Sequence, residues 1–365
     1  MRADARSATD VAQLLAAQAP SGAIYAAHTT PHYRLCWIRD AAFCAVALGT
    51  AGEATAAWRF HAWMADVILA QAPRLERAVV AAYRGRPAAR EDHLACRFEA
   101  DGRPGPADWL SDQLDGPGIW LWSLVRLADR RPLEGDIARA AELAARYLAA
   151  RWAEPTADAW EEHPDARATS TLGAVVAGLH AAEALGLLQA DDRVALRAAS
   201  RHLHHLGDDV IGLPKSDRVA GPDASLLWLG PLYGLFAPDD PRWIATVKQV
   251  EGALEAPHGG VYRYPADTFY GGGEWPILAA SLALARIARG EDRDAVRARR
   301  ALAWIEAQAD PSGSLPEQVT CHPLHPEAVA RWRQDWGPPA RPLAWSHAMA
   351  LLLRRALVAG TPEGR

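Results

Sequence analysis

Thr171-Leu172-Gly173-Ala174-Val175-Val176-Ala177-Gly178-Leu179 is the stretch that decides the fold. It follows Thr169 and Ser170, which are residue types that favour the N-cap of a helix. Residues 40–48 and 275–282 are almost as uniformly apolar. A helix that has no polar face belongs in the interior of a protein. These stretches therefore predict helices that are buried on all sides.

Amphipathic stretches alternate with the apolar ones along the chain. Residues 135–153 and 294–308 each carry charged side chains on one face and apolar side chains on the other, which is typical of a helix at the protein surface. Start and stop signals predict about twelve helices. Their predicted starts are near Thr9, Ile38, Glu53, Ile119, Pro132, Thr169, Ala190, Pro222, Arg242, Trp275, Arg293 and Leu343.

The alternation of the two kinds of helix predicts the architecture. The odd-numbered helices are amphipathic and the even-numbered ones are apolar, so the chain is expected to be all-α, with an inner ring of apolar helices surrounded by an outer ring of amphipathic ones. This arrangement is an (α/α)6 toroid. An open helical solenoid would need a more regular repeat than this sequence has. We expect a short hairpin at residues 95–102, and we treat residues 1–365 as a single domain.

Composition and charge exclude several classes of function. The formal net charge is −5, and lysine occurs at Lys215 and Lys248 alone, so the chain has no basic surface for nucleic acid. The polar N-terminal region has no apolar core of a signal peptide, and no uninterrupted apolar run of about 18 residues follows. We therefore expect no membrane partner and a cytoplasmic protein. The sequence does not predict an oligomeric state.

Cysteine and histidine do not suggest a metal site or a cofactor. The four cysteines have no Cys-x-x-Cys spacing, so neither a zinc ribbon nor a disulfide framework is predicted. His202, His204 and His205 lack the i, i+4 spacing that places two ligands on one helix face. The segment from Cys321 to His325 is interpreted as an ordinary loop. We accordingly expect no bound metal and no cofactor.

Polar and aromatic residues gather just before the even-numbered helices. The clusters are residues 33–40, 109–118, 160–162, 221–223 and 262–274, with Glu317 before the last helix. In a toroid the segments that precede the inner helices meet at one mouth of the ring. The sequence therefore predicts one site at that mouth.

Two carboxylates in these clusters are candidates for acid–base chemistry. An adjacent pair such as Glu161 and Glu162 is usually just solvated, and a single loop carboxylate such as Glu317 is commonly inert. At the mouth of an apolar barrel, however, desolvation beside Trp160 raises the pKa of a carboxyl group toward that of a general acid. Hydrolysis of an acetal needs two carboxylates that flank one bond, and Glu161 with Glu317 can supply them.

Six motifs make the chain resemble the glucoamylases, the family 15 glycoside hydrolases. They occur in family order over residues 20–355, and the six matches together identify the family more specifically than any single match does. The matching segments are Tyr33-Arg34-Leu35-Cys36-Trp37-Ile38-Arg39-Asp40, Trp109-Leu110-Ser111-Asp112-Gln113-Leu114-Asp115-Gly116-Pro117, Trp160-Glu161-Glu162, Arg263-Tyr264-Pro265-Ala266-Asp267 with Tyr270-Gly271-Gly272, Ser314-Leu315-Pro316-Glu317-Gln318 and Leu343-Ala344-Trp345-Ser346.

This resemblance implies an inverting, exo-acting α-glycosidase that releases β-glucose, with Glu161 as general acid and Glu317 as general base. It also implies a small carbohydrate substrate. The residues that the resemblance places around the sugar are Tyr33, Trp37, Arg39, Asp40, Trp109, Trp160, Glu162, Arg263 and Trp345. We expect neither the N-terminal β-sandwich nor the starch-binding module of some relatives, so short oligosaccharides or a small glycoside are favoured over granular starch.

The sequence departs from the family pattern at two places. Residues 163–170 lack the aromatic-Thr pair that is usual after the acid motif, and Gly273-Glu274-Trp275 stands where relatives typically carry Asn-Pro-Trp. Glu274 is therefore a candidate substrate-binding residue that selects a cationic sugar. The alternative is that its side chain faces solvent.

Three other functions are compatible with parts of the pattern. A trehalase is covered by the same resemblance. An inactive toroid that binds a sugar or a protein is disfavoured because both candidate carboxylates are present. A terpene cyclase would need an aspartate-rich metal motif, whereas Asp239-Asp240-Pro241 has no partner acids nearby.

Overall fold

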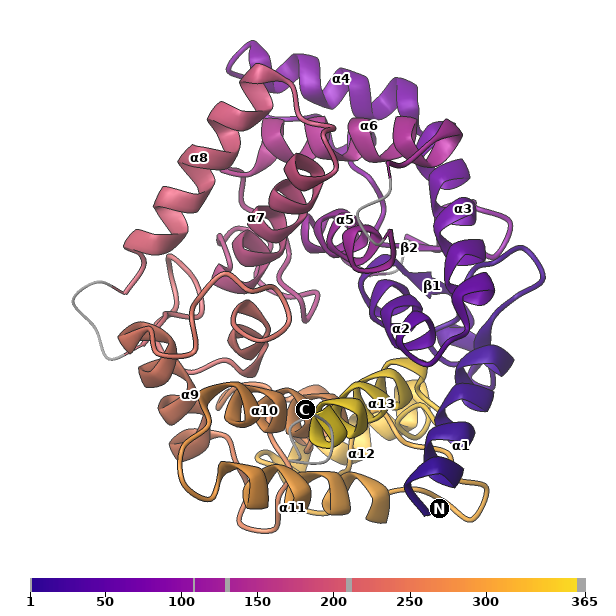
Figure 1. The fold of residues 1–365 in the computed structure, drawn as a ribbon, viewed down its shortest axis with the longest axis vertical. Coiled ribbons are helices and arrows are strands. Elements are labelled where there is room, and N and C mark those ends of the chain that lie inside the picture. The colour runs from indigo at the N-terminus through magenta and orange to yellow at the C-terminus, as the bar shows by residue number, and fades with distance from the viewer. Residues whose placement is uncertain (1, 108, 129–131, 208–211, 360–365) are drawn as a thin grey trace.

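The computed structural model describes residues 2–107, 109–128, 132–207 and 212–359. Its inner elements form a closed ring, seen end-on in Figure 1. Each inner element contacts the next, and the last contacts the first. In ring order they are α2 (Ile38–Thr50), α5 (Asp115–Leu127), α7 (Thr169–Ala184), the 3-10 helix η3 (Ala224–Leu229), α10 (Pro276–Arg289) and α13 (Ala344–Ala359).

Six further helices surround this ring and pack against it (Figure 1). They are α1 (Arg2–Ala17), α3 (Ala54–Ala70), α6 (Gly135–Arg151), α8 (Ala190–His205), α9 (Pro241–Ala253) and α11 (Asp294–Ala307). The predicted (α/α)6 toroid is therefore confirmed. The apolar stretch at residues 171–179 is buried along its whole length in α7, as its lack of a polar face requires.

Two glycines allow α5 and α7 to approach each other closely. A Cβ atom built on Gly118 would lie 2.4 Å from the backbone oxygen of Ala174, and one on Gly178 would lie 2.6 Å from the backbone oxygen of Gly118. No side chain fits at either position without moving a helix backbone. Glycine is thus required where these two inner helices touch.

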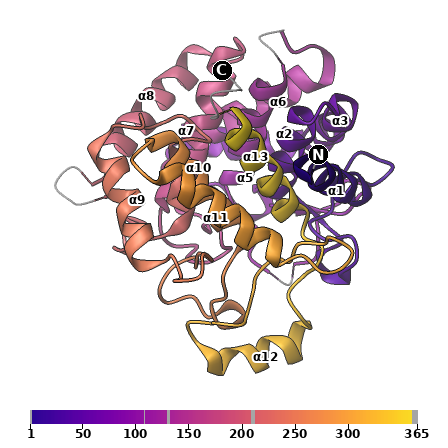
Figure 2. The ribbon, with the colours of Figure 1, turned by 60° about the horizontal axis from the view of Figure 1, so that its bottom comes forward.

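The structure differs from the prediction at three elements. The helix predicted near Pro222 is only the short η3, which ends at Gly230 with the non-helical φ and ψ of −85° and −90°. A Cβ atom at Gly230 would lie 2.5 Å from the ring of Trp243. Two helices were not predicted: α4 (Ala72–Tyr83), which packs outside α6, and α12 (Pro326–Trp336). Figure 2 shows α12 projecting from the body of the ring, and none of its residues is buried.

One small sheet lies at the mouth of the ring. Strand β1 (Cys36–Trp37) pairs antiparallel with β2 (Arg97–Phe98), and Trp37 is opposite Arg97. Phe98 also bridges Pro104, so the predicted hairpin is present in a minimal form. The register brings Trp37 and Arg97 side by side, with the guanidinium carbon 5.5 Å from the centre of the Trp37 ring.

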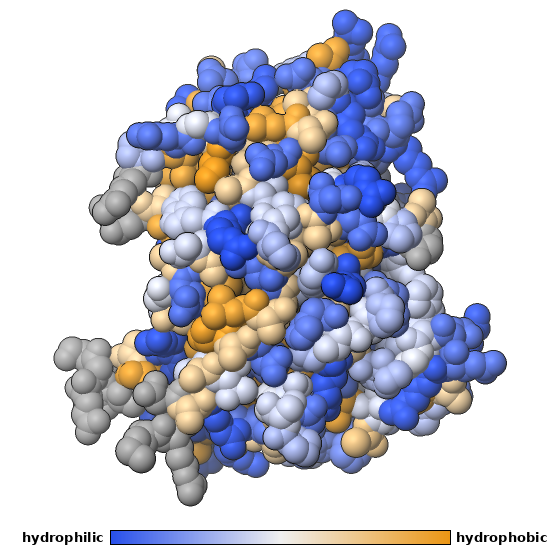
Figure 3. All heavy atoms as spheres, turned by 90° about the vertical axis from the view of Figure 1, so that its right-hand side faces the viewer, coloured by the Kyte–Doolittle hydropathy of each residue, from blue (hydrophilic) through white to orange (hydrophobic). Residues whose placement is uncertain are grey.

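The outer surface of the ring is largely polar. On the side that carries α1 and α3, Figure 3 shows hydrophilic side chains over most of the face and apolar ones in separate patches. Among the described helices, none has both the length and the apolar character needed to cross a membrane.

Candidate active site

A cavity of ≈ 420 Å³ opens where the segments before the inner helices meet. This is the size range of pockets that bind small molecules. Eleven of the twelve residues predicted for the site line it: Tyr33, Trp37, Arg39, Asp40, Trp109, Trp160, Glu161, Glu162, Arg263, Glu317 and Trp345. Glu274 is not among the lining residues. Five of the six predicted clusters therefore meet at this cavity, whereas residues 221–223 do not line it.

A tight turn presents Glu161 to the cavity. The Asp158 carboxylate caps this turn, because its Oδ1 accepts the backbone N–H groups of Trp160 at 2.9 Å and Glu162 at 3.0 Å. Glu161 has a φ of 64°, in the left-handed region that a residue with a Cβ rarely occupies. Such backbone strain is typical of residues whose side chains are held for a function.

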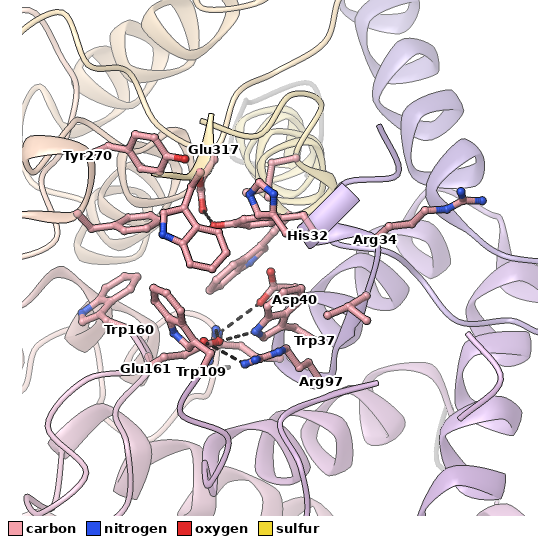
Figure 4. A pocket seen from close by; sticks show the side chains of 18 of the residues that line it. His32, Arg34, Trp37, Asp40, Arg97, Trp109, Trp160, Glu161, Tyr270 and Glu317 are labelled. Carbon is pink, nitrogen blue, oxygen red and sulfur yellow. Dashed lines mark hydrogen bonds and ion pairs between the residues drawn. The ribbon is translucent and has the colours of Figure 1, made fainter. Parts of the chain in front are cut away.

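Cationic and donor groups surround the Glu161 carboxylate. The indole N–H of Trp37 donates to Oε1, the Arg39 guanidinium lies 3.8 Å from Oε1, and the Arg97 guanidinium lies 3.7 Å from Oε2 (Figure 4). Burial nevertheless raises the pKa of Glu161 to about 7, because the lowering by these neighbours is smaller than the cost of desolvation. The group can therefore hold a proton near neutral pH.

Glu317 lies on the other side of the cavity, in the extended segment between α11 and α12. Its Oε1 accepts the hydroxyl of Tyr33 at 2.7 Å, and burial raises its pKa to about 7 despite the lowering by Tyr33 and Arg263. Its Oε2 is buried and has no hydrogen-bond partner in the described part of the protein.

The two carboxylates face each other across the cavity, as Figure 4 shows. Tyr33 donates to Glu317 and Trp37 donates to Glu161, and the rings of Tyr33 and Trp37 are 5.5 Å apart between centres. Each carboxylate is therefore held by a different aromatic residue of the segment before α2. Because burial raises both pKa values to about 7, the pKa values do not distinguish an acid from a base.

Charged residues at the starts of α2 and α5 form a polar part of the cavity wall. Arg39 donates to Asp115 at 3.0 Å and lies 3.4 Å from Asp40, which lines the cavity. Burial raises the pKa of Asp40 to about 6, with Arg39 lowering it and Asp115 raising it. A carboxylate beside a guanidinium offers both an acceptor and a donor to adjacent hydroxyls.

Arg263 and Glu162 form a second charged pair in the wall. Arg263 lies 3.3 Å from Glu162 and is held by Asp267, while the Tyr264 hydroxyl donates to Glu162. The Arg263 guanidinium carbon also lies 5.1 Å from the ring centres of Trp160 and Phe269. Aromatic faces on both neighbours keep this cation in place by cation–π attraction.

Stacked aromatic rings close the inner end of the cavity. Trp345 lines the cavity and stacks on Phe43 behind it, with 5.3 Å between ring centres, and Trp228 lies 5.4 Å from Trp345. At the outer end, the ring centres of Trp332 and Trp336 of α12 lie 6.2 Å and 5.5 Å from the ring centre of Trp109. The cavity therefore narrows to a closed aromatic floor and opens under α12.

Sequence reasoning did not identify the buried ion network behind the Glu161 turn. Lys215, which is 5% exposed, lies 2.6 Å from Asp223 and 3.3 Å from Asp158. Asp223 also accepts the indole N–H of Trp160 at 3.0 Å. Burial lowers the pKa of Lys215, but Asp223 and Asp158 raise it more, so it stays above the ordinary value. The rarity of lysine was the one feature of the sequence that pointed to Lys215. Nothing in the sequence singled out Arg97, Trp332 or Trp336 as cavity residues.

Both interpretations of Glu274 differ from the structure. The side chain is 1% exposed, so it does not face solvent, and it points away from the cavity toward His258. The reason is local: residues 274 and 275 are extended, and successive side chains in extended backbone point to opposite sides. Because Trp275 lines the cavity, Glu274 faces the other way.

Two groups in the described chain combine three potential metal ligands: Asp158, Glu162 and His163, and His258, Glu274 and His322. The first group lies at the cavity, beside the cations Lys215 and Arg263, which oppose a bound cation. The second lies outside it.

Comparison with known proteins identifies the family. The family model described as glycosyl hydrolases family 15 matches residues 6–308. The chain is similar to the isomaltose glucohydrolase of Kribbella flavida, with 38% identity over 343 residues, 92% of this chain and 88% of that protein.

Solved structures agree in fold. A variant glycosidase in complex with glucose has a TM-score of 0.90 and 37% identity, covering 98% of this chain and 97% of that chain. A glucoamylase from Saccharomycopsis fibuligera has a TM-score of 0.73 at 15% identity, covering 98% of this chain and 95% of that chain, which is a likeness of fold alone. Since the family model matches most of the chain and the similarity to an enzyme of 38% identity extends over nearly all of it, the protein is a glycoside hydrolase and belongs to the glycosyl hydrolases family 15.

Proposed function

We propose that the protein is an inverting, exo-acting α-glucosidase that removes a terminal glucose from a short oligosaccharide or small α-glucoside. Glu161 is the general acid and Glu317 the general base in this proposal, which takes residues 1–365 as one catalytic domain. The observation that carries it is the placement of two buried carboxylates on opposite sides of one cavity. This is the arrangement that single-step acetal hydrolysis requires.

In the proposed reaction, Glu161 donates its proton to the glycosidic oxygen as the bond from that oxygen to the anomeric carbon breaks. A water molecule attacks the anomeric carbon from the opposite face and gives a proton to Glu317. The product sugar is the β-anomer. Glu161 is then ionised and Glu317 protonated, so the protons must exchange with solvent before the next cycle. The position of Glu317 in the cavity wall, opposite Glu161, supports its role as the acceptor.

The closed floor supports the exo-acting part of the proposal. Trp345, Phe43 and Trp228 block the inner end, so a chain of sugars enters with one terminal unit. Arg39 and Asp40 lie beside this floor and are proposed to bind hydroxyls of that unit. Glu162 and Arg263 lie farther along the wall and are proposed to contact the next sugar. The tryptophans of α12, near Trp109, border the same end of the cavity.

The similarity to an isomaltose glucohydrolase supports a disaccharide of glucose as the first substrate to test. Proton NMR of fresh reactions with isomaltose, maltose and trehalose measures the rate and the product anomer together. We expect isomaltose to be hydrolysed fastest, with the glucose from its non-reducing end appearing first as the β-anomer, above the α/β mixture that the reducing-end unit contributes. Preferential hydrolysis of trehalose would favour the trehalase alternative, and no hydrolysis of any α-glucoside would favour a sugar-binding protein. An early excess of α-glucose over the share of the reducing-end unit in isomaltose or maltose would contradict inversion.

A further inference from the structure

We propose that His258, Glu274 and His322 form a binding site for a zinc-like divalent ion outside the catalytic cavity. The three residues come from three separate segments, and their ligand atoms all lie within 4.8 Å of one another. Two imidazoles and one carboxylate are a ligand set that zinc binds in proteins, with water completing the coordination.

The carboxylate is the buried member of the group. Glu274 is 1% exposed, one of its oxygens is hydrogen bonded to Nε2 of His258, and its Oε2 has no hydrogen-bond partner in the described part of the chain. A buried carboxylate without a full set of partners is costly, because desolvation disfavours its charge. A divalent cation bound to this oxygen would offset that cost.

The two histidines are accessible from solvent. Both are exposed, and the centres of their rings are 4.2 Å apart with an angle of 47° between the planes. Zinc–nitrogen distances are about 2.0–2.1 Å, so two imidazole nitrogens bound to one zinc ion lie within about 4 Å of each other. In the structure the ligand atoms all lie within 4.8 Å of one another, so binding needs at most a small further approach. Rotation of the two exposed side chains can supply this adjustment.

Backbone pairing fixes the three segments against one another. Glu274 exchanges two hydrogen bonds with Val319, at 2.9 and 2.7 Å, and Trp275 donates to Val261 at 2.8 Å. His258 lies in the turn between Glu255 and Val261, and His322 follows Val319 by three residues. The ligands are thus held near one another without a metal, which lowers the entropic cost of binding.

Two neighbours complete the surroundings of the carboxylate. A Cβ atom on Gly260 would lie 2.6 Å from Cδ of Glu274, so glycine at this position leaves the space that the side chain occupies. The Tyr262 hydroxyl donates to the backbone oxygen of His322 at 2.9 Å and lies 3.4 Å from Oε1 of Glu274. Outer partners of this kind orient the residues that bind a metal.

The position of the site gives it a structural role. Glu317 precedes His322 by five residues in the same segment, and the neighbour of Glu274, Trp275, lines the catalytic cavity. A bound ion would therefore link the segment that carries Glu317 to the start of α10 and to the turn at His258. We expect it to stabilise the fold rather than to take part in hydrolysis.

The test is zinc binding to the whole chain after treatment with a chelator and its removal. All proteins carry Cys321→Ser, so that the exposed thiol does not bind zinc. Calorimetric titration is carried out at about pH 7.5, because metal ligands bind in their deprotonated form. We expect one zinc ion per chain, a rise in Tm of at least about 2 °C on zinc addition, and no binding of magnesium or calcium.

The variants His258→Ala and His322→Ala should each weaken zinc binding by at least about 100-fold, since loss of even an outer partner costs about 10- to 100-fold. Both residues are exposed, so both variants should fold. His180→Ala is the matched control, because His180 is also exposed and has a carboxylate, that of Glu183, at 4.0 Å. Unchanged zinc affinity in both single variants, or no zinc binding by the parent protein, would overturn the proposal.

Discussion

Glu161 and Glu317 lie on opposite walls of the cavity, and different contacts hold the segments that carry them, called here the Glu161 wall and the Glu317 wall. The turn at Glu161 is capped by a buried carboxylate, which is itself paired with Lys215, and its backbone is strained. The segment at Glu317 is held by main-chain pairing, since Glu317 N–H donates to the backbone oxygen of Ala340 and Leu343 N–H to that of Leu315, both at 2.9 Å. Two side chains of α13 add to this: Leu315 N–H donates to Nε2 of His347 at 3.0 Å, and Ser346 donates to the backbone oxygen of Pro316 at 2.7 Å. Carboxylates paired with Lys215 therefore support the Glu161 turn, whereas main-chain pairing and two side chains of α13 hold the Glu317 segment.

The different contacts predict different responses of the two walls to mutation. A buried ion pair contributes little net stability, but the loss of one partner is costly because the other charge stays buried. Backbone hydrogen bonds do not depend on the identity of a side chain. A substitution at Lys215 should therefore perturb the Glu161 wall at a distance, whereas the Glu317 wall should respond mainly to changes at Glu317 and at His347 and Ser346, which hold its segment.

The largest effect is expected at the two carboxylates themselves. Glu161→Gln and Glu317→Gln should each lower kcat on a glucose disaccharide by about 10²- to 10⁴-fold, the usual contribution of a general acid or base. On α-glucosyl fluoride the two variants should separate, because fluoride leaves without protonation. Glu161→Gln should recover most of its rate on this substrate, and Glu317→Gln should not.

Circular dichroism of both variants is the control, since each should keep the fold. The reverse pattern on the fluoride would exchange the two roles. Equal impairment of both variants on both substrates would contradict the assignment of an acid and a base to these residues.

A smaller effect, without loss of a reacting group, is expected at Lys215. Lys215→Met leaves the carboxylates of Asp158 and Asp223 buried without their cation, so the free energy of unfolding should fall by about 3–5 kcal/mol. The turn that carries Glu161 should lose its support, and kcat should fall with it. Urea unfolding and steady-state kinetics measure the two changes.

Lys248→Met is the matched control, because Lys248 is the other lysine of the chain and is exposed on α9. It should change the free energy of unfolding by less than about 0.5 kcal/mol. If the two lysine variants are equally stable, the Glu161 wall does not depend on its buried charges.

The contrast between the walls also explains what the sequence can predict. The toroid follows from burial patterns, because a helix such as α7 shows its environment in its composition. The lining of the cavity follows from motifs before the inner helices. The support of Glu161 by Lys215 has no local pattern, since it joins residues far apart in the chain through buried charge.

Two misses have the same cause. The orientation of Glu274 depends on which side of an extended segment faces the cavity, and η3 ends at Gly230, where a Cβ atom would lie 2.5 Å from the ring of Trp243. Both features involve packing between distant segments, which periodicity along one segment does not report. The helix α12 is different, because Val329, Trp332 and Trp336 recur at helical spacing although none of its residues is buried.

The smallest effect concerns the cost of burying each carboxylate. Burial raises the pKa of Glu161 and of Glu317 from 4.5 to about 7. Between these pH values the unfolded chain loses the proton that the folded chain keeps, so wild-type stability falls as pH rises from about 4.5 to 7. The difference corresponds to about 3 kcal/mol for each group above pH 7.

Glutamine has no proton to lose over this range. The variants Glu161→Gln and Glu317→Gln should therefore match the wild type in free energy of unfolding at pH 4 and exceed it by up to about 3 kcal/mol at pH 8. Urea unfolding at both pH values measures this gain. Equal gains in the free energy of unfolding at pH 8 would mean that burying the ionised carboxylate costs the same at both walls. A gain at Glu317 alone would mean that Arg39 and Arg97 stabilise the ionised form of Glu161 enough to cancel its burial, and the pKa of that group would then lie near its ordinary value.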